Sequence, residues 1–172
     1  MNDVTAGHYD PEMLPTVAKL GCSIILMHMR GSDPSTMNNK ANTSYPGGLI
    51  PTIARELLSR IHAAEAAGIP RWRILLDPGI GFSKTLSQNL EIIRSFSTLR
   101  ATPELRGFGW VVGASRKGFI GTITGVKVAR ERSWGTAAVV AAGVQAGVDV
   151  CRVHDVAEMG RVVRMGEAIW RV

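Results

Sequence analysis

Apolar and polar positions along the chain form two alternating patterns. Short apolar runs of strand length occupy residues 23–27, 74–76, 110–112 and 148–153, and residues 1–4 look like the end of another strand. Stripes at helical spacing occupy residues 11–20, 49–67, 86–99, 134–145 and 159–169. Run 74–76 has too many consecutive aliphatic side chains for a strand with one face in water. The alternation therefore predicts parallel strands joined by right-handed crossovers.

Two segments near the end of this series have an unusual composition. Residues 134–145 are nearly all apolar and rich in alanine, which predicts a helix buried in the core. The glycine-spaced stretch that ends at Ser133 predicts a long loop. Long ordered loops are often functional.

Composition limits the class of protein. With 172 residues, 45% of them hydrophobic, the chain is expected to form one domain with one core. Twenty Lys and Arg against 14 Asp and Glu favour an anionic partner. Aromatic residues make up only 6% and no tight basic run occurs, which argues against nucleic acid. Cys22 and Cys151 lack CxxC spacing and are expected to be free thiols in a reducing compartment.

No signal-peptide pattern and no apolar run of membrane-spanning length is apparent in these residues. We therefore expect a cytoplasmic protein that does not associate with membranes.

Asp77 ends the most apolar of the strand runs. Pro78 keeps Asp77 extended, and Gly79 and Gly81 allow a sharp turn and close approach to a ligand. The carboxyl end of a buried strand is where α/β folds place their binding chemistry. The simpler alternative is a carboxylate that only caps a turn.

Parallel strands would bring the segments that follow them to one end of the sheet. The polar side chains collected there are Asn2, Arg30, Asp77, Lys84, Ser115, Arg116, Lys117, Arg152 and His154. Cations dominate, which suits a pyrophosphate or a carboxylate. Among cations, Asp77 should stay ionised and accept paired N–H donors from a flat heterocycle.

Other kinds of chemistry have less support. His28 lies between Met27 and Met29, which is more typical of a packed side chain than of a ligand. Metal binding by His28 and His154 has no supporting Cys or carboxylate spacing. The sequence contains no Ser-His-Asp order and no Walker motif, which argues against acyl transfer and P-loop chemistry.

Four motifs stand out along the chain: LMHMRG at 26–31, DPGIGFSK at 77–84, GASRKGFIG at 113–121 and RVHDV at 152–156. In order and spacing they resemble the dihydropteroate synthase family, and NDVTAG at 2–7 fits that family's fourth strand. The sequence is most similar to the multifunctional eukaryotic folate-synthesis form. The resemblance implies a transferase that condenses 6-hydroxymethyl-7,8-dihydropterin pyrophosphate with p-aminobenzoate. The products would be dihydropteroate and pyrophosphate.

The resemblance also implies site residues. It assigns the pterin to Asn2, Met27, Asp77 and Lys117, the pyrophosphate to Arg152 and His154, and p-aminobenzoate to Phe82, Ser115 and Lys117. Lys117, Arg152 and His154 would be the catalytic residues. Cationic groups would stabilise the departing pyrophosphate, so that the weak aniline nitrogen can attack the pterin methylene without a protein nucleophile.

The family's fold is a (β/α)8 barrel of about 250 residues, with the site at its C-terminal mouth. Compared with that complete barrel, the chain corresponds to a partial TIM barrel that runs from the end of strand 4 through helix 8. We therefore expect residues 1–172 to form a single incomplete pterin-binding barrel domain, inactive by itself. The implied Mg²⁺ would have its protein ligand upstream, with no metal ligand in these residues. The resemblance also implies a homodimer, fused upstream enzymes of the same pathway, and compatibility with a mitochondrial location.

Three alternatives remain open on the sequence. One is a pterin- or anion-binding module without turnover. Another is a related pterin-dependent methyltransferase barrel, although a methyl carrier has no pyrophosphate for residues 115–121 and 152–156 to hold. A third is a freestanding doubly wound domain, for which five parallel strands suffice. Periodicity alone does not separate a doubly wound domain from part of a barrel.

Overall fold

The computed structural model describes residues 1–31, 33–37 and 39–171. Five strands form one parallel sheet: β1 (Asn2–Asp3), β2 (Ile24–Met27), β3 (Ile74–Asp77), β4 (Gly109–Val112) and β5 (Val150–Cys151). They lie in the order β1-β2-β3-β4-β5, so each strand pairs with its neighbour in sequence. The predicted parallel alternation is confirmed.

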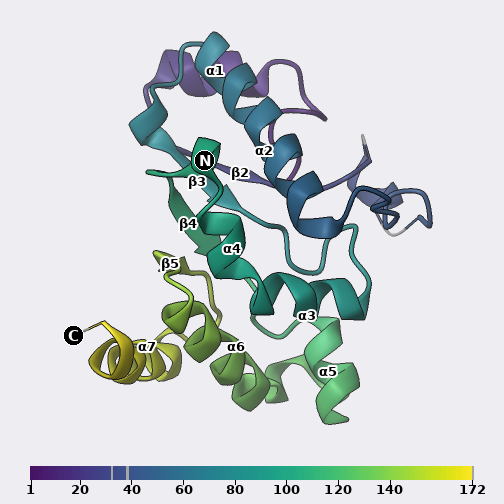
Figure 1. The fold of residues 1–172 in the computed structure, drawn as a ribbon, viewed down its shortest axis with the longest axis vertical. Coiled ribbons are helices and arrows are strands. Elements are labelled where there is room, and N and C mark those ends of the chain that lie inside the picture. Colours follow the sequence, from purple (N-terminus) through teal and green to yellow (C-terminus); the bar gives the residue numbers. More distant parts are fainter. Residues whose placement is uncertain (32, 38, 172) are drawn as a thin grey trace.

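Helices connect the strands and follow one another along one side of the sheet (Figure 1). They are α1 (Met13–Leu20), α2 (Leu49–Ala66), α3 (Leu86–Arg94), α4 (Phe96–Arg100), α5 (Gly118–Thr124), α6 (Ser133–Gln145) and α7 (Val156–Trp170). Short 3₁₀ turns occur at η1 (Pro34–Thr36), η2 (Arg71–Arg73), η3 (Pro103–Leu105) and η4 (Ala129–Glu131). No helix among the described residues is both long and apolar enough to cross a bilayer.

The two faces of the sheet differ in burial. The face toward the helices carries side chains that are at most 2% exposed: Ile24, Leu26, Ile74, Leu76 and Trp110. On the other face, Met27, Asp77 and Val111 are at most 4% exposed, Ile25 and Leu75 are half-buried, and Asn2 and Val150 are exposed. A doubly wound sheet has helices on both faces and a reversal in strand order. The fold is instead α/β with the sequential strands and one-sided helices of part of a (β/α)8 barrel, as predicted.

Three elements differ from their predictions. The helix expected over 86–99 changes direction at Ser95, where α3 ends and α4 begins. Part of the expected long loop is helix α5, whose Phe119 and Ile120 are buried in the core. The last strand spans only Val150–Cys151 instead of residues 148–153.

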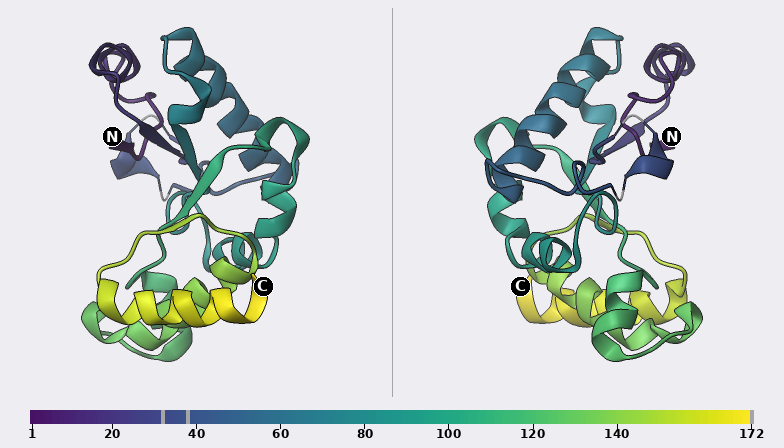
Figure 2. Two further views of the ribbon diagram at one scale, coloured as in Figure 1. Left: turned by 90° about the vertical axis from the view of Figure 1, so that its left-hand side faces the viewer. Right: turned by 90° about the vertical axis from the view of Figure 1, so that its right-hand side faces the viewer.

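Helix α6 was predicted to be buried because it is nearly all apolar, and that prediction is wrong for much of its surface. Its buried residues are Thr136, Val140, Gly143 and Val144, whereas Trp134 is 88% exposed. Figure 2 shows α6 and α7 side by side at one end of the molecule. An apolar composition shows that a helix lacks a polar face, but neighbouring elements decide which face they cover.

Candidate active site

Asp77 lies at the carboxyl end of β3, beside the end of β2. The register pairs Met27 with Asp77, and Asn2 on β1 pairs with Ile25, two positions before Met27. Side chains alternate between the faces of a strand, so Asn2, Met27 and Asp77 project from the same face. This is the face away from the helices, and the three predicted pterin-binding residues of β1, β2 and β3 therefore share it.

The Asp77 carboxylate is buried, and its hydrogen bond and neighbouring cations offset only part of the cost of removing it from water. Its side chain is 4% exposed, and Oδ1 accepts a hydrogen bond of 2.7 Å from the Gly79 N–H. Burial raises the pKa of Asp77, while the Gly79 N–H and the cations Lys117, Lys84 and Arg152 act in the opposite direction. The predicted cations do surround Asp77, but the sequence argument for a fully ionised carboxylate omitted the cost of desolvation.

The turn after Asp77 depends on glycine at two positions. Gly79 has φ 70°, and a Cβ there would lie 1.9 Å from the carbonyl oxygen of His28. Gly81 has φ 82°, and its Cβ would lie 2.8 Å from Cδ of Lys117. The absence of side chains lets the turn contact β2 and lets Lys117 cross over it.

Lys117 bridges the turn and an aromatic ring. Its Nζ donates a hydrogen bond to the Ile80 carbonyl and lies 4.5 Å from the centroid of the Phe82 ring, a cation–π distance. Burial lowers the pKa of Lys117 to about 8, although Asp77 opposes this shift. Lys117 is therefore close to both the buried carboxylate and the ring.

A cavity of about 340 Å³ adjoins this bridge. Phe82, Lys84, Lys117 and Phe119 are among its lining residues. Of the three residues predicted to bind p-aminobenzoate, Phe82 and Lys117 line the cavity. Among the described lining residues Ser115 does not appear.

Ser115 instead contacts His154. Its Oγ lies 2.9 Å from His154 Nδ1 and accepts the His154 main-chain N–H at 3.2 Å. Arg152 lies against the end of β4, since a Cβ on Gly113 would be 2.6 Å from its Nη2. Residues 148–153 were predicted to form the last strand, but β5 ends at Cys151, and Arg152 and His154 lie beyond it. Contacts with Gly113 and Ser115 position Arg152 and His154, respectively.

Arg116, one of the predicted strand-end cations, is paired with a carboxylate. Its Nη2 donates to Asp155 Oδ1, and its Nε lies 3.4 Å from Asp155 Oδ2. Ser133 at the start of α6 donates to the same oxygen at 2.9 Å. The hydrogen bond from Arg116 is the largest cause that lowers the pKa of Asp155. Arg116 thus joins the segments after β4 and β5.

The sequence assigned the predicted Mg²⁺ a protein ligand upstream of these residues, and this stays a prediction. Within residues 1–31, 33–37 and 39–171, no three His, Cys, Asp or Glu side chains are grouped so that they could hold a metal ion. The charged groups that act on Asp77 are cationic. The site residues described here therefore do not fit the metal, and we assign no chemical step to it.

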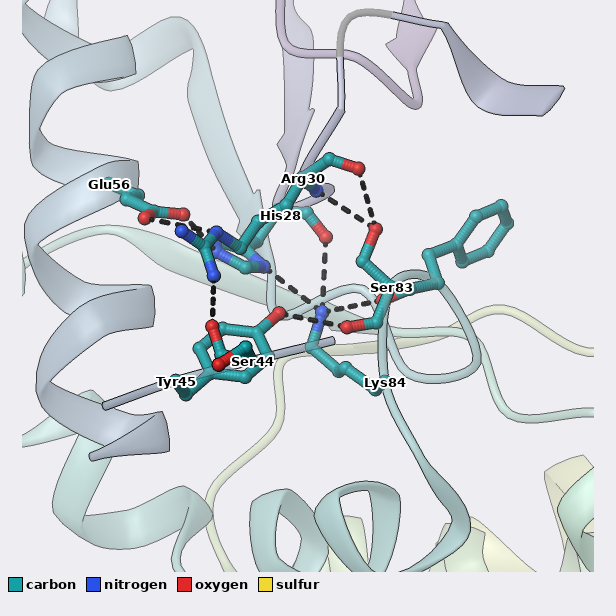
Figure 3. A network of polar contacts seen from close by, with 8 residues as sticks. His28, Arg30, Ser44, Tyr45, Glu56, Ser83 and Lys84 are labelled. Atoms are coloured by element: carbon teal, nitrogen blue, oxygen red, sulfur yellow. Dashed lines mark hydrogen bonds and ion pairs between the residues drawn. The ribbon is translucent and has the colours of Figure 1, made fainter. Parts of the chain in front are cut away.

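A buried polar network behind the site was only partly foreseen (Figure 3). His28 is 3% exposed and Lys84 7%, which confirms that His28 is a packed side chain. His28 lies 2.9 Å from Glu56 on α2 and 3.0 Å from Lys84, and in the same network the Tyr45 hydroxyl donates to the Ser83 carbonyl. Sequence reasoning missed Tyr45, Glu56 and Ser83 because nothing in their spacing marks them as neighbours.

The fold and the site define the class: a parallel α/β protein with a buried carboxylate and several cations at the carboxyl ends of its strands. The chain belongs to the pterin binding enzyme family, whose model matches residues 1–154.

Individual relatives agree with this assignment. The chain is 46% identical to the folic acid synthesis protein fol1 of Pneumocystis carinii, over 99% of the chain and 23% of that protein. It resembles the structure of FolP, a dihydropteroate synthase from Clostridium difficile solved in the presence of pteroic acid, with a TM-score of 0.88 and 32% identity. It also resembles the Thermus thermophilus dihydropteroate synthase in complex with 4-aminobenzoate, with a TM-score of 0.87 and 35% identity.

The match covers nearly all of this chain but only part of each relative. It takes in 99% of this chain and 59% of the Clostridium structure, and 98% of this chain and 65% of the Thermus structure. The chain thus spans less than two thirds of the proteins it matches.

Gly79→Ala is expected to lower the free energy of unfolding by about 2 kcal/mol more than Gly107→Ala. Both positions have a positive φ, but a Cβ meets the His28 carbonyl at residue 79 and nothing within 4 Å at residue 107. The control therefore carries the conformational cost alone, about 1 kcal/mol. Urea denaturation of both variants measures the difference, and equal losses would contradict the close approach of the turn to β2.

Proposed function

We propose that this chain carries the catalytic residues of a dihydropteroate synthase, which joins p-aminobenzoate to 6-hydroxymethyl-7,8-dihydropterin pyrophosphate. The observation that carries the proposal is the position of Lys117 between Asp77 and Phe82. Lys117 acts on the pKa of the buried Asp77 carboxylate and lies 4.5 Å from the Phe82 ring. One cation therefore adjoins both a carboxylate suited to a pterin and a cavity suited to an aromatic amine. Relatives solved with pteroic acid and with 4-aminobenzoate support this interpretation.

The pterin would bind on the face shared by Asn2, Met27 and Asp77. The Asp77 carboxylate would accept paired N–H donors from the ring, and Met27 would provide an apolar surface beneath it. Arg152 and His154 would hold the pyrophosphate, since Arg152 already acts on both Asp77 and Lys117.

The reaction then needs positioning and charge stabilisation. The bond between the pterin methylene carbon and the pyrophosphate oxygen breaks, and pyrophosphate leaves with the electron pair. Cations around the leaving group stabilise the charge that develops on it. The amine lone pair of p-aminobenzoate forms the new C–N bond, and the nitrogen then loses a proton to solvent. No protein nucleophile takes part.

Residues 1–172 are proposed to form part of a larger barrel domain. The proposal is supported by the partly exposed face that carries Ile25, Leu75 and Val150, which further strands would cover. It is also supported by the 23% share of the Pneumocystis protein that the chain spans, which leaves room for fused enzymes of the same pathway. The cytoplasmic or mitochondrial location stays a prediction from sequence.

A homodimer is the proposed assembly. Helices α6 and α7 expose large apolar side chains, a feature typical of interfaces: Trp134, Val156, Met165, Ile169 and Trp170. Sedimentation of the wild-type and Trp134→Glu proteins tests this, and an unchanged molar mass would argue against Trp134 in the interface.

The second candidate is a pterin- and anion-binding module without turnover. The open sheet face and the lack of a metal-binding group in the described residues favour it for this chain alone. One experiment separates the candidates. Calorimetry first measures binding of the pterin pyrophosphate to residues 1–172. A pyrophosphate-release assay then compares this protein with a chimera that adds the preceding segment of the Pneumocystis relative.

A synthase is expected to release pyrophosphate in the chimera only when p-aminobenzoate is present. Binding without any release in the chimera would support the binding module. If the wild-type chain and the chimera bind neither the pterin pyrophosphate nor p-aminobenzoate, the proposed function is wrong.

A further inference from the structure

Lys84 uses all of its hydrogen-bonding capacity inside the protein. Its ammonium nitrogen lies 3.0 Å from His28 Nδ1, 3.3 Å from the His28 carbonyl oxygen and 2.9 Å from the Phe82 carbonyl oxygen (Figure 3). An ammonium has three N–H donors and no acceptor, so these three partners satisfy it. The side chain is 7% exposed, and the group is therefore committed to the protein.

The Lys84 contact determines the tautomer of His28. Burial lowers the pKa of Lys84 to about 7, and protonated Lys84 can only donate, so Nδ1 then accepts from Lys84 and the ring hydrogen lies on Nε2. Nε2 lies 2.9 Å from Oε2 of Glu56, which accepts that hydrogen. Burial lowers the pKa of His28 to about 4, which keeps the ring neutral, as this arrangement requires. A directed chain of hydrogen bonds thus runs from Lys84 through His28 to Glu56 on α2.

The residue between Phe82 and Lys84 is held in an unfavourable backbone conformation. Ser83 has φ 51°, in the left-handed region that non-glycine residues seldom adopt. Its Oγ donates to the Arg30 carbonyl at 2.8 Å and accepts the Arg30 N–H at 3.0 Å. The Tyr45 hydroxyl donates to the Ser83 carbonyl at 2.9 Å. These contacts hold the turn in the shape that lets Lys84 reach back to the Phe82 carbonyl.

Phe82 is therefore fixed on two sides. Its carbonyl accepts a hydrogen bond from buried Lys84, and its ring faces the Lys117 ammonium at 4.5 Å. Phe82, Lys84 and Lys117 all line the cavity beside the turn. The Glu56–His28–Lys84 chain thus connects α2 to the wall of that cavity.

We propose that Lys84, oriented by His28 and Glu56, is a positioning residue that places Phe82 and Lys117 for the aromatic amine substrate and so sets its affinity. The identity of that amine rests on the proposed function. The positioning itself rests on the contacts of Lys84 with His28 and Phe82. Asp77 and the leaving-group residues lie outside this hydrogen-bonded chain, but Lys84 is one of the cations that act on Asp77. Binding of the pterin pyrophosphate should therefore depend on Lys84 less than binding of the amine does.

The test compares Lys84→Met, Glu56→Ala and Glu56→Gln in the protein of residues 1–172 and in the chimera. Lys84→Met is expected to weaken p-aminobenzoate binding about tenfold, the effect of about one charge-assisted hydrogen bond. It should weaken pterin pyrophosphate binding less, because it also removes one of the cations that act on Asp77. Glu56→Ala should have the same selective effect. Glu56→Gln keeps an oxygen that accepts the His28 hydrogen, and it should restore most of the affinity. Exposed Lys19 supplies the control variant Lys19→Met.

Nitrogen NMR of His28 gives a readout independent of ligands. The wild type should show the Nε2–H tautomer, and Lys84→Met should shift the Nδ1 resonance. In proton spectra, Lys84→Met should also weaken the contacts between the Phe82 ring and the Lys117 methylenes. Equal weakening for both ligands would mean that Lys84 only stabilises the fold. If no ligand binds even to the wild type, the proposed function fails, and the NMR alone then tests the positioning role of Lys84. An Nδ1–H tautomer, or unchanged Phe82–Lys117 contacts in Lys84→Met, would overturn the positioning role.

Discussion

Replacing Asp77 with asparagine is expected to weaken binding of the bare pterin by about 1–3 kcal/mol, the range for spoiling a hydrogen bond to a charged group. The carboxylate offers acceptors only, whereas an asparagine turns an NH₂ group toward one of the pterin N–H donors. The side chain is 4% exposed, so water cannot replace the lost acceptor. The Asn oxygen can still accept the Gly79 N–H, which now binds Asp77 at 2.7 Å, so the turn should persist.

Calorimetry with 6-hydroxymethylpterin measures the effect in the chimera. Asp10→Asn is a matched control, because Asp10 is exposed and its Oδ1 accepts the Glu12 N–H in the same manner. The control should bind pterin as the wild type does. Unchanged affinity in Asp77→Asn would show that Asp77 only closes the turn, the simpler alternative for this carboxylate.

Arg152→Ala is expected to lower turnover in the chimera about 100-fold or more, the usual cost of removing one group that stabilises a developing anion. The same variant should weaken binding of the pterin pyrophosphate much more than binding of the bare pterin. Arg152 is also one of the cations that lower the pKa of Asp77, so a smaller loss for the bare pterin is expected too. The result to compare is therefore the ratio of the loss in affinity for the pterin pyrophosphate to the loss in affinity for the bare pterin.

His154→Ala should show the same selectivity, because His154 and Arg152 both lie against residues 113–115. Exposed Arg161 on α7 provides a control of the same charge, Arg161→Ala. Equal losses for the pyrophosphate substrate and the bare pterin would assign Arg152 and His154 to the architecture of the site and not to the leaving group.

Local pattern in the sequence was enough to predict most of the elements and the end of the sheet where the polar residues gather. Apolar runs and helical stripes depend on neighbours a few positions away, so they locate strands and helices. Once the strands are parallel, Asp77, Lys117 and Arg152 must follow strand ends at one edge. Glycine is required at residues 79 and 81 for a related local reason, the positive φ of the turn. The motifs around these residues also identified the family.

Only the tertiary structure decided which faces of the sheet and of helix α6 are buried. Part of a barrel and a doubly wound sheet have the same periodicity, and the strand order β1-β2-β3-β4-β5, without a reversal, distinguishes them. Helix α6 is apolar all round, so its sequence could not say that Trp134 is exposed.

The contacts that orient the site join residues far apart in the chain. His28 meets Glu56 28 positions away, Lys84 meets His28 56 positions away, and Ser115 meets His154 39 positions away. Each pair forms because two strands or a strand and a helix are packed at a particular distance and angle. The same packing removes water from Lys84 and Asp77 and shifts the pKa of each. Residue type alone carries no information about either the packing or the desolvation.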